Sequence, residues 1–185
     1  FLREMEFNRL LSSVISAYGE PELENISIEK KSEKKQQNIN KKNYHLITRE
    51  KEIDQWINEA EEVGELAIDT ETSSLDAHQA DLVGISLSTK IGKACYIPIG
   101  HKFKGCLKNE TVIKKLKPLL EDKSVKKIGQ NIKFDFIVLF KQGIIMNSME
   151  DTMLMSYVLD AGKNRHNMDT LSEIHLQHKT ISFKE

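Results

Sequence analysis

A short apolar run that ends in two acidic residues constrains this chain more than any other feature. Leu66, Ala67 and Ile68 form the run, and Asp69 and Glu71 follow it. Such a run is typical of a buried strand. Side chains two positions apart in a strand share a face, so the two carboxylates should lie side by side and repel each other. A divalent cation such as Mg²⁺, which takes oxygen ligands, would relieve the repulsion; a solvated strand end before a polar turn is the other interpretation.

The composition predicts a globular protein with no overall attraction to nucleic acid. The 185 residues are 39% hydrophobic, which is enough for a core, and 27 basic against 28 acidic side chains leave a net charge of -1. Any contact with nucleic acid must therefore use local patches. The longest apolar run, residues 136–140, is too short to span a membrane, and the start of the chain has no apolar signal segment. We expect a cytoplasmic protein with no membrane partner.

Composition divides the chain into three parts. Residues 1–18 carry apolar side chains at roughly helical spacing and predict a helix that ends at Gly19. Residues 19–43 are rich in charged and amide side chains, which predicts a flexible linker; a basic arm that binds nucleic acid is the alternative. Residues 44–185 hold the remaining patterns. Because the chain begins with Phe1 and ends at Glu185 without a polar tail, we expect it to be a piece of a longer protein.

The third part alternates strand patterns with helix patterns. After a short strand at 44–47 and a helix that ends at Gly64, the acidic strand and the segments 82–88 and 94–99 predict a three-stranded antiparallel meander. Further on, the sequence predicts a helix around 112–120, a strand at 126–129, a buried helix at 131–142, and helices at 151–159 and from about 168. The predicted fold class is α/β, a mixed sheet flanked by helices.

A third carboxylate, Asp135, falls inside the apolar helix at 131–142. A buried charge is costly unless it is paired or bound to a metal. A salt bridge to Lys133 or Lys127 is one explanation, and a metal site shared with the acidic strand is the other.

Together these segments resemble a known family, the 3′–5′ proofreading exonuclease domain of bacterial family A DNA polymerase I. Residues 68–76 are similar to its first motif and residues 129–135 to its second, and residues 94–101, 151–157 and 165–171 match as well. The family belongs to the DEDD exonucleases, which implies a ribonuclease H-like fold. The resemblance runs from 44 to 185, and residues 1–18 resemble the tail of the 5′-nuclease domain that precedes it in such polymerases.

The resemblance implies a catalytic centre with two divalent metal ions, Mg²⁺ or Mn²⁺. Asp69 would bridge the two ions, Glu71 would bind one of them and help to orient the attacking water, and Asp135 would hold the second. In a two-metal site the ions activate water and stabilise the leaving oxygen. The implied reaction is hydrolysis of the terminal phosphodiester at a DNA 3′ end.

The resemblance also implies contacts with the 3′ end of single-stranded DNA. Leu75 would wedge against the terminal bases, and Gln130 and Asn131 would contact the strand near the scissile phosphate. Phe183 would stack on the DNA. In the full protein the domain would be fused to polymerase and 5′-nuclease domains.

The chain departs from the family where the fourth carboxylate is expected. That residue belongs to a Tyr-x-x-x-Asp motif, but Tyr157 and Asp160 are separated by two residues instead of three, and the histidine variant of the motif is absent as well. The domain would then be incomplete at its C-terminal end. Two alternatives follow: a catalytically incomplete scaffold that binds nucleic acid in a polymerase, or an exoribonuclease of the same superfamily.

Overall fold

The computed structural model describes residues 1–5, 7–19 and 43–181, in two compact units that divide between residues 35 and 36. The first unit contains helix α1 (Asn8–Tyr18), which buries none of its residues. It ends at Gly19, whose φ of 83° suits a residue without a Cβ, so the predicted helix and its end are confirmed. The predicted linker lies almost entirely outside the described residues, and Phe183 lies outside them as well.

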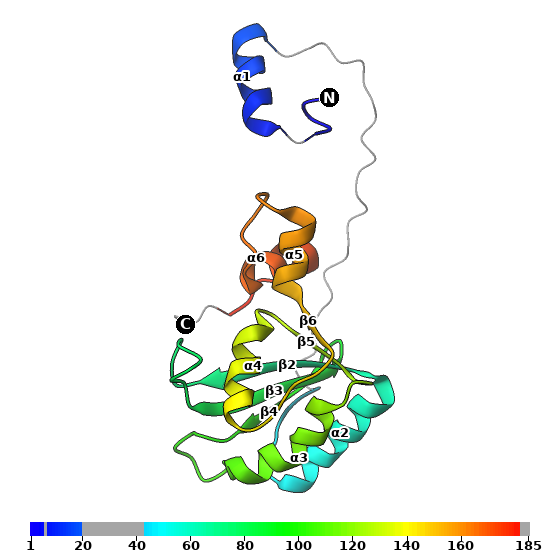
Figure 1. The fold of residues 1–185 in the computed structure, drawn as a ribbon, viewed down its shortest axis with the longest axis vertical. Coiled ribbons are helices and arrows are strands. Elements are labelled where there is room, and N and C mark those ends of the chain that lie inside the picture. The colour runs from blue at the N-terminus through cyan, green and yellow to red at the C-terminus, as the bar shows by residue number, and fades with distance from the viewer. Residues whose placement is uncertain (6, 20–42, 182–185) are drawn as a thin grey trace. The chain divides into compact units, whose positions relative to one another are not determined.

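Within residues 43–181 the second unit is built on one mixed sheet of six strands (Figure 1). The strands are β1 (Tyr44–Leu46), β2 (Glu65–Thr72), β3 (Leu82–Lys90), β4 (Lys93–Pro98), β5 (Lys126–Gly129) and β6 (Met149–Asp151). Their order in the sheet is β1-β4-β3-β2-β5-β6. β2, β3 and β4 form the predicted antiparallel meander, whereas β1 pairs in parallel with β4, and β5 pairs in parallel with β2 and β6. The α/β fold class is confirmed.

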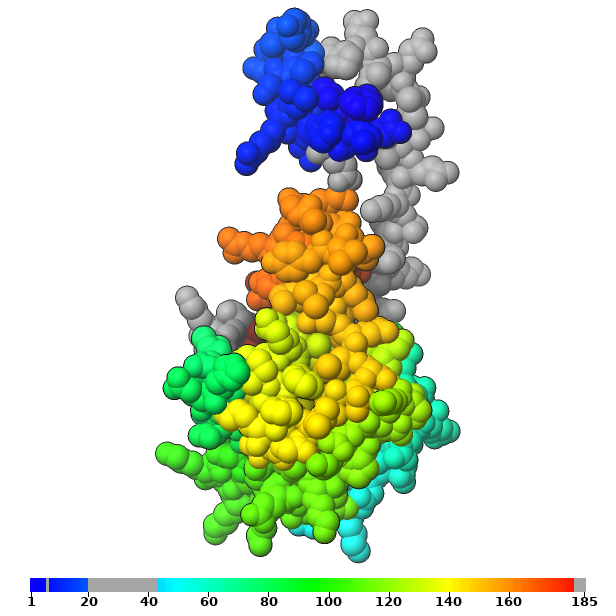
Figure 2. All heavy atoms as spheres, in the orientation of Figure 1, coloured from blue at the N-terminus to red at the C-terminus, as the bar shows by residue number. Residues whose placement is uncertain are grey.

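Within the same described range, five helices follow or separate these strands. They are α2 (Glu50–Val63), α3 (Asn109–Glu121), α4 (Ile132–Lys141), α5 (Thr152–Asp160) and α6 (Met168–Leu176). α2 and α3 pack against each other, and their apolar faces join the sheet in one core. All five helices are predicted from the sequence. The expectation that α4 is buried all round is wrong, since Phe140 is 56% exposed and Figure 2 shows the yellow atoms of α4 on the surface facing the viewer.

The alternation of β2 sets which side chains reach the core. Leu66, Ile68 and Thr70 are buried, whereas Asp69 and Glu71 lie on the exposed face. Burying a Leu or Ile side chain stabilises a fold by about 1.5–3 kcal/mol, and a shift of register by one residue would expose both of them. The apolar residues of β2 therefore fix the face on which the two carboxylates stand.

No helix among residues 1–5, 7–19 and 43–181 combines the length and the apolar character needed to cross a membrane.

Candidate active site

The sheet topology brings the second acidic motif to the end of β2. β5 runs parallel to β2, so both strands end at the same edge of the sheet, and α4 begins three residues after β5 ends. Gly129 permits the tight junction, because a Cβ there would lie 2.9 Å from Ile132 Cγ1. Asn131 turns the chain into α4 in the left-handed conformation, with φ 58° and ψ 42°. The first turn of α4, which carries Asp135, is thereby placed against β2.

Asp135 is held by a threonine between the two acidic residues of β2. Its side chain is 3% exposed, and its Oδ1 accepts hydrogen bonds from the Thr70 backbone N–H at 2.8 Å and from the Thr70 hydroxyl at 2.6 Å. The alternative salt bridge is wrong for Lys127, whose Nζ donates to the backbone carbonyls of Asp122 and Val125. Among the described residues no ion pair includes Asp135. A hydroxyl and a peptide N–H, and not a lysine, satisfy this buried oxygen.

The three carboxylates make the site strongly negative. Burial, then the charge of Asp135 and then that of Glu71 raise the pKa of Asp69 to about 6. Burial also raises the pKa of Asp135, against the lowering effect of the two hydrogen bonds from Thr70. Like charges that disfavour each other's ionised forms are typical of sites where a cation or a proton completes the balance.

The donor chemistry fits a hard divalent cation, although the side chains do not already converge on one. Asp69, Glu71 and Asp135 offer carboxylate oxygens, the ligands that Mg²⁺ and similar ions take. Among the described residues, however, no group of three or more Asp, Glu, His or Cys side chains is close enough to hold a metal. Asp69 and Glu71 stand on the exposed face of β2, whereas Asp135 is tied to Thr70, which points to the buried side. A cation held by all three carboxylates would therefore require at least one of these side chains to move.

Asp151 fixes the start of α4 relative to α5. Its Oδ1 accepts from the backbone N–H of Asn131 at 2.9 Å and of Met153 at 2.9 Å, and its Oδ2 accepts from that of Ile132 at 3.1 Å. One buried carboxylate thus caps two helices. Sequence reasoning missed this role. An acidic residue directly before a helical pattern is the signal that could have found the α5 cap, but not the link to α4.

Leu75 lies on the loop after β2 and is 98% exposed. The loop is closed by two hydrogen bonds between Ser73 and Asp81, from Ser73 N–H to the Asp81 carbonyl at 3.0 Å and from Asp81 N–H to the Ser73 hydroxyl at 2.9 Å. On this loop the Leu75 side chain points to solvent and does not pack in the core. This placement is compatible with a wedge against bases, which stays a prediction.

Gln130 and Asn131 lie beside the site, and Gln130 is already engaged within the protein. Its amide N–H₂ donates to the His166 carbonyl at 2.8 Å, and its Oε1 accepts from the Thr152 hydroxyl at 2.5 Å. The Asn131 side chain makes no capping bond to α4. The predicted contacts of both residues with DNA are not tested by this geometry, but Gln130 would have to give up internal partners to make one.

Sequence reasoning also missed Tyr96 as a neighbour of the site. Tyr96 pairs with Ser86, which in turn pairs with Asp69, and its ring leans over Gly84, the partner of Glu71. A Cβ at position 84 would lie 2.0 Å from the Tyr96 hydroxyl oxygen. Burial and the Glu71 charge raise the pKa of this hydroxyl. A glycine inside a strand pattern, which often marks a close approach, is the signal that could have found it.

Comparison with known proteins gives a consistent picture. A family model described as 3′-5′ exonuclease matches residues 44–185. DNA polymerase I of Rhizobium leguminosarum is 45% identical over 154 residues, which cover 72% of this chain and 15% of that protein. DNA polymerase I of Pseudomonas aeruginosa is 40% identical over 148 residues, which cover 77% of this chain and 16% of that protein. The chain therefore spans about a sixth of the length of these curated relatives.

Solved structures share the fold. Brucella melitensis NrnC with bound Mg²⁺ is 25% identical, with a TM-score of 0.56 over 75% of this chain and 63% of that one. The POL domain of Pol1 from M. smegmatis, in complex with DNA primer-template and dNTP, is 19% identical, with a TM-score of 0.61 over 74% of this chain and 23% of that one. At that identity the second likeness speaks for the fold alone.

Proposed function

Since the chain belongs to the 3′-5′ exonuclease family of bacterial DNA polymerase I, we propose that residues 44–185 act as its metal-dependent 3′–5′ exonuclease on DNA. The observation that carries the proposal is that three carboxylates lie on or against one strand, β2, where the charges of Asp135 and Glu71 act on Asp69. Asp69 and Glu71 come from the exposed face of β2, and Asp135 reaches the same strand from α4. Burial first, and then the charges of Asp135 and Glu71, raise the pKa of Asp69, and a bound cation would offset both effects.

Asp69, Glu71 and Asp135 would hold two divalent ions, Mg²⁺ or Mn²⁺. Bound there, such ions supply charge stabilisation for the phosphate and lower the pKa of water. The Mg²⁺ bound to NrnC supports a metal in this fold. The protein's own part is positional: Thr70 fixes Asp135, and Asp151 fixes the helix that carries it.

The substrate is proposed to be a single-stranded 3′ end. Leu75 would then press against the terminal bases, and Asn131, Gln130 and Phe183 would contact the strand. The relatives are about six times longer than the matched region, which supports a fusion with polymerase and 5′-nuclease domains. As part of the same proposal, we expect the protein to act in the bacterial cytoplasm, where DNA is synthesised.

The test is shortening of a 5′-labelled single-stranded DNA with Mg²⁺ or Mn²⁺. We expect stepwise loss from the 3′ end by the wild type and none by Asp69→Ala, whose folding should be nearly intact. Glu62→Ala, which removes an exposed carboxylate from α2, should cleave like the wild type. Cleavage that survives Asp69→Ala would refute the carboxylate assignment. Binding without cleavage, both by the wild type and by an extended chain that carries the missing Tyr and Asp, would favour the scaffold. Faster cleavage of the matching RNA would favour the exoribonuclease.

A further inference from the structure

The Tyr96 ring lies over the cross-strand partner of Glu71 because that partner is a glycine and leaves room for it. The Tyr96 hydroxyl and ring occupy the space that a side chain at Gly84 would take, with the ring atom Cζ 2.3 Å from the position of a Cβ. Gly84 is the cross-strand partner of Glu71, and such partners have Cβ positions about 4.5–5.5 Å apart. The ring therefore sits next to Glu71, on the exposed face of the sheet, and is itself only partly buried.

Two further rings continue from Tyr96 into the loop after β4. The Tyr96 hydroxyl and His101 Nε2 share a hydrogen bond of 2.6 Å, and their ring centroids are 5.6 Å apart. The Phe103 ring follows at 6.1 Å from His101. It lies against Gly105, where a Cβ would be 2.3 Å from its ring edge. The three rings form a row, here called the aromatic row, that starts beside Glu71. At each end the ring fills the space that a side chain on a glycine would take.

The aromatic row is open to solvent at its outer end. His101 is exposed, and Phe103 is 44% exposed although it is a large apolar side chain. The hydrogen bond to Tyr96 ties the loop to the sheet, and one from the Cys106 thiol to the His101 carbonyl at 3.2 Å closes the loop on itself. A surface that is ordered before binding loses little entropy when a ligand arrives.

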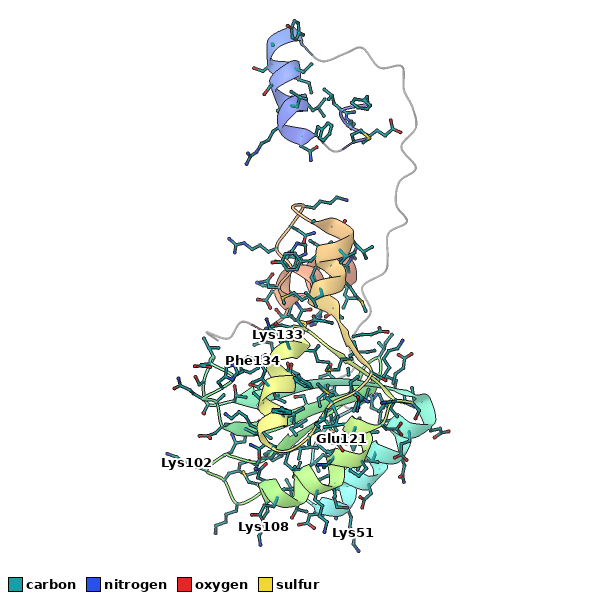
Figure 3. The ribbon with its side chains drawn as sticks, in the orientation of Figure 1. Lys51, Lys102, Lys108, Glu121, Lys133 and Phe134 are labelled. Carbon is teal, nitrogen blue, oxygen red and sulfur yellow. The ribbon has the colours of Figure 1, made fainter. Side chains whose placement is uncertain are left out.

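Two lysines alternate with these rings along the chain, Lys102 next to His101 and Lys104 next to Phe103. Both are exposed, and no ion pair within residues 43–181 includes either of them. Figure 3 shows Lys102 projecting outward at the lower left, well apart from Lys51 of α2. In a chain with a net charge of -1, two exposed cations on one loop that make no ion pair among the described residues are a local patch of the kind that meets phosphates.

We propose that the aromatic row and these two lysines form a binding track for the single strand whose 3′ end lies at the carboxylates. Tyr96 and Phe103 would offer ring faces to bases, and Lys102 and Lys104 would neutralise phosphates that the acidic site repels. Aromatic faces combined with cationic side chains are the means by which proteins bind single strands without reading their sequence. The inference rests on the proposed exonuclease function, but the track can bind without cleavage.

The test is equilibrium binding of a 5′-fluorescent oligothymidylate, measured by anisotropy in EDTA, so that no cleavage is needed. Phe103→Ala should weaken binding by about fivefold or more, the effect of losing one stacked base. The same variant should bind an abasic strand of equal length like the wild type, since no base remains to stack. Phe140→Ala, which removes a ring of α4 that is 56% exposed against 44% for Phe103, is the matched control and should change neither affinity.

The lysines are tested through salt. The double variant Lys102→Ala/Lys104→Ala should reduce the slope of log affinity against log salt by about 1.4, because each phosphate contact with a single strand contributes about 0.7. Lys51→Ala/Lys123→Ala removes two other exposed lysines and should leave the slope unchanged. Wild-type affinity and slope in the Phe103 and lysine variants would overturn the track even if the protein cleaves DNA. Weaker binding by these variants in a protein that never cleaves would keep the track and refute the nuclease.

Discussion

Thr70→Val removes one hydroxyl from the site and keeps the shape of the side chain. The hydroxyl donates to Asp135 Oδ1 at 2.6 Å, where both groups are buried. A hydrogen bond to a charged group contributes about 1.5–3 kcal/mol. The backbone N–H of residue 70 would remain as the donor, so Asp135 should stay near its place but be held less firmly.

We expect Thr70→Val to lower the free energy of unfolding by about 2 kcal/mol. If holding Asp135 in position contributes the same amount to the transition state, kcat/KM for single-stranded DNA should fall about 30-fold. The concentration of Mn²⁺ that gives half-maximal activity should rise as well. Urea unfolding, steady-state cleavage and a Mn²⁺ titration of activity measure the three effects.

Two variants separate positioning from general destabilisation. Thr70→Ser restores the hydroxyl and should recover most of the activity and the Mn²⁺ dependence. Thr89→Val changes an equally buried threonine of β3, 7% exposed against 8% for Thr70, at a site near Glu59. It should leave cleavage unchanged. Wild-type kcat/KM in Thr70→Val, or a Thr70→Ser variant as impaired as Thr70→Val, would refute the reasoning.

Three further changes test the electrostatics and packing. Asp69→Asn should raise the free energy of unfolding of the metal-free protein by about 1 kcal/mol at pH 8, after discounting for exposure, and should not change it at pH 4. The reason is that the pKa of Asp69 is raised to about 6, so the wild type loses stability as the pH rises from about 4 through 6. Equal urea midpoints for the two proteins at pH 8 would contradict this. Glu59→Gln should lower the free energy of unfolding by about 1 kcal/mol at pH 7. Lys93 and then Lys90 lower the pKa of Glu59 to about 2, so the stabilisation from Glu59 is present above about pH 4.5 and fades towards pH 2. A loss of stability that does not depend on pH would refute the pairing. Gly84→Ala should lower the free energy of unfolding by about 1–3 kcal/mol, because the added methyl group would overpack against Tyr96. In a Tyr96→Ala background, which removes the clashing ring, urea unfolding should show that most of this loss has disappeared.

The elements that sequence patterns predict best are those with strong local periodicity. The meander follows from alternation in β2, β3 and β4, and the helices follow from their apolar faces, because burial selects one face of each element. β6 escapes prediction because its three residues, Met149–Asp151, form no apolar run and pair only at the sheet edge. The position of β6 is set by its parallel pairing with β5, and no local sequence pattern reveals that pairing.

In the candidate site, too, the features that depend on local spacing can be predicted from the sequence, whereas the contacts that depend on strand pairing cannot. The spacing of Asp69 and Glu71 places both on one face of a strand, and the structure confirms it. The contact between Thr70 and Asp135 joins residues 65 positions apart and depends on the parallel pairing of β5 with β2. Spacing alone leaves a lysine partner for Asp135 equally reasonable. Tyr96 over Gly84 depends on the register of β3 with β4, which likewise appears only in the folded sheet.

The most direct test of the central claim, a cation site formed by Asp69, Glu71 and Asp135, is a Mn²⁺ titration followed by the electron paramagnetic resonance signal of the free ion. The account predicts saturable binding by the wild type that Asp69→Asn and Asp135→Asn each weaken by about tenfold or more. Glu62→Gln, an exposed carboxylate on α2, should titrate like the wild type. Identical binding curves for all four proteins would contradict the account.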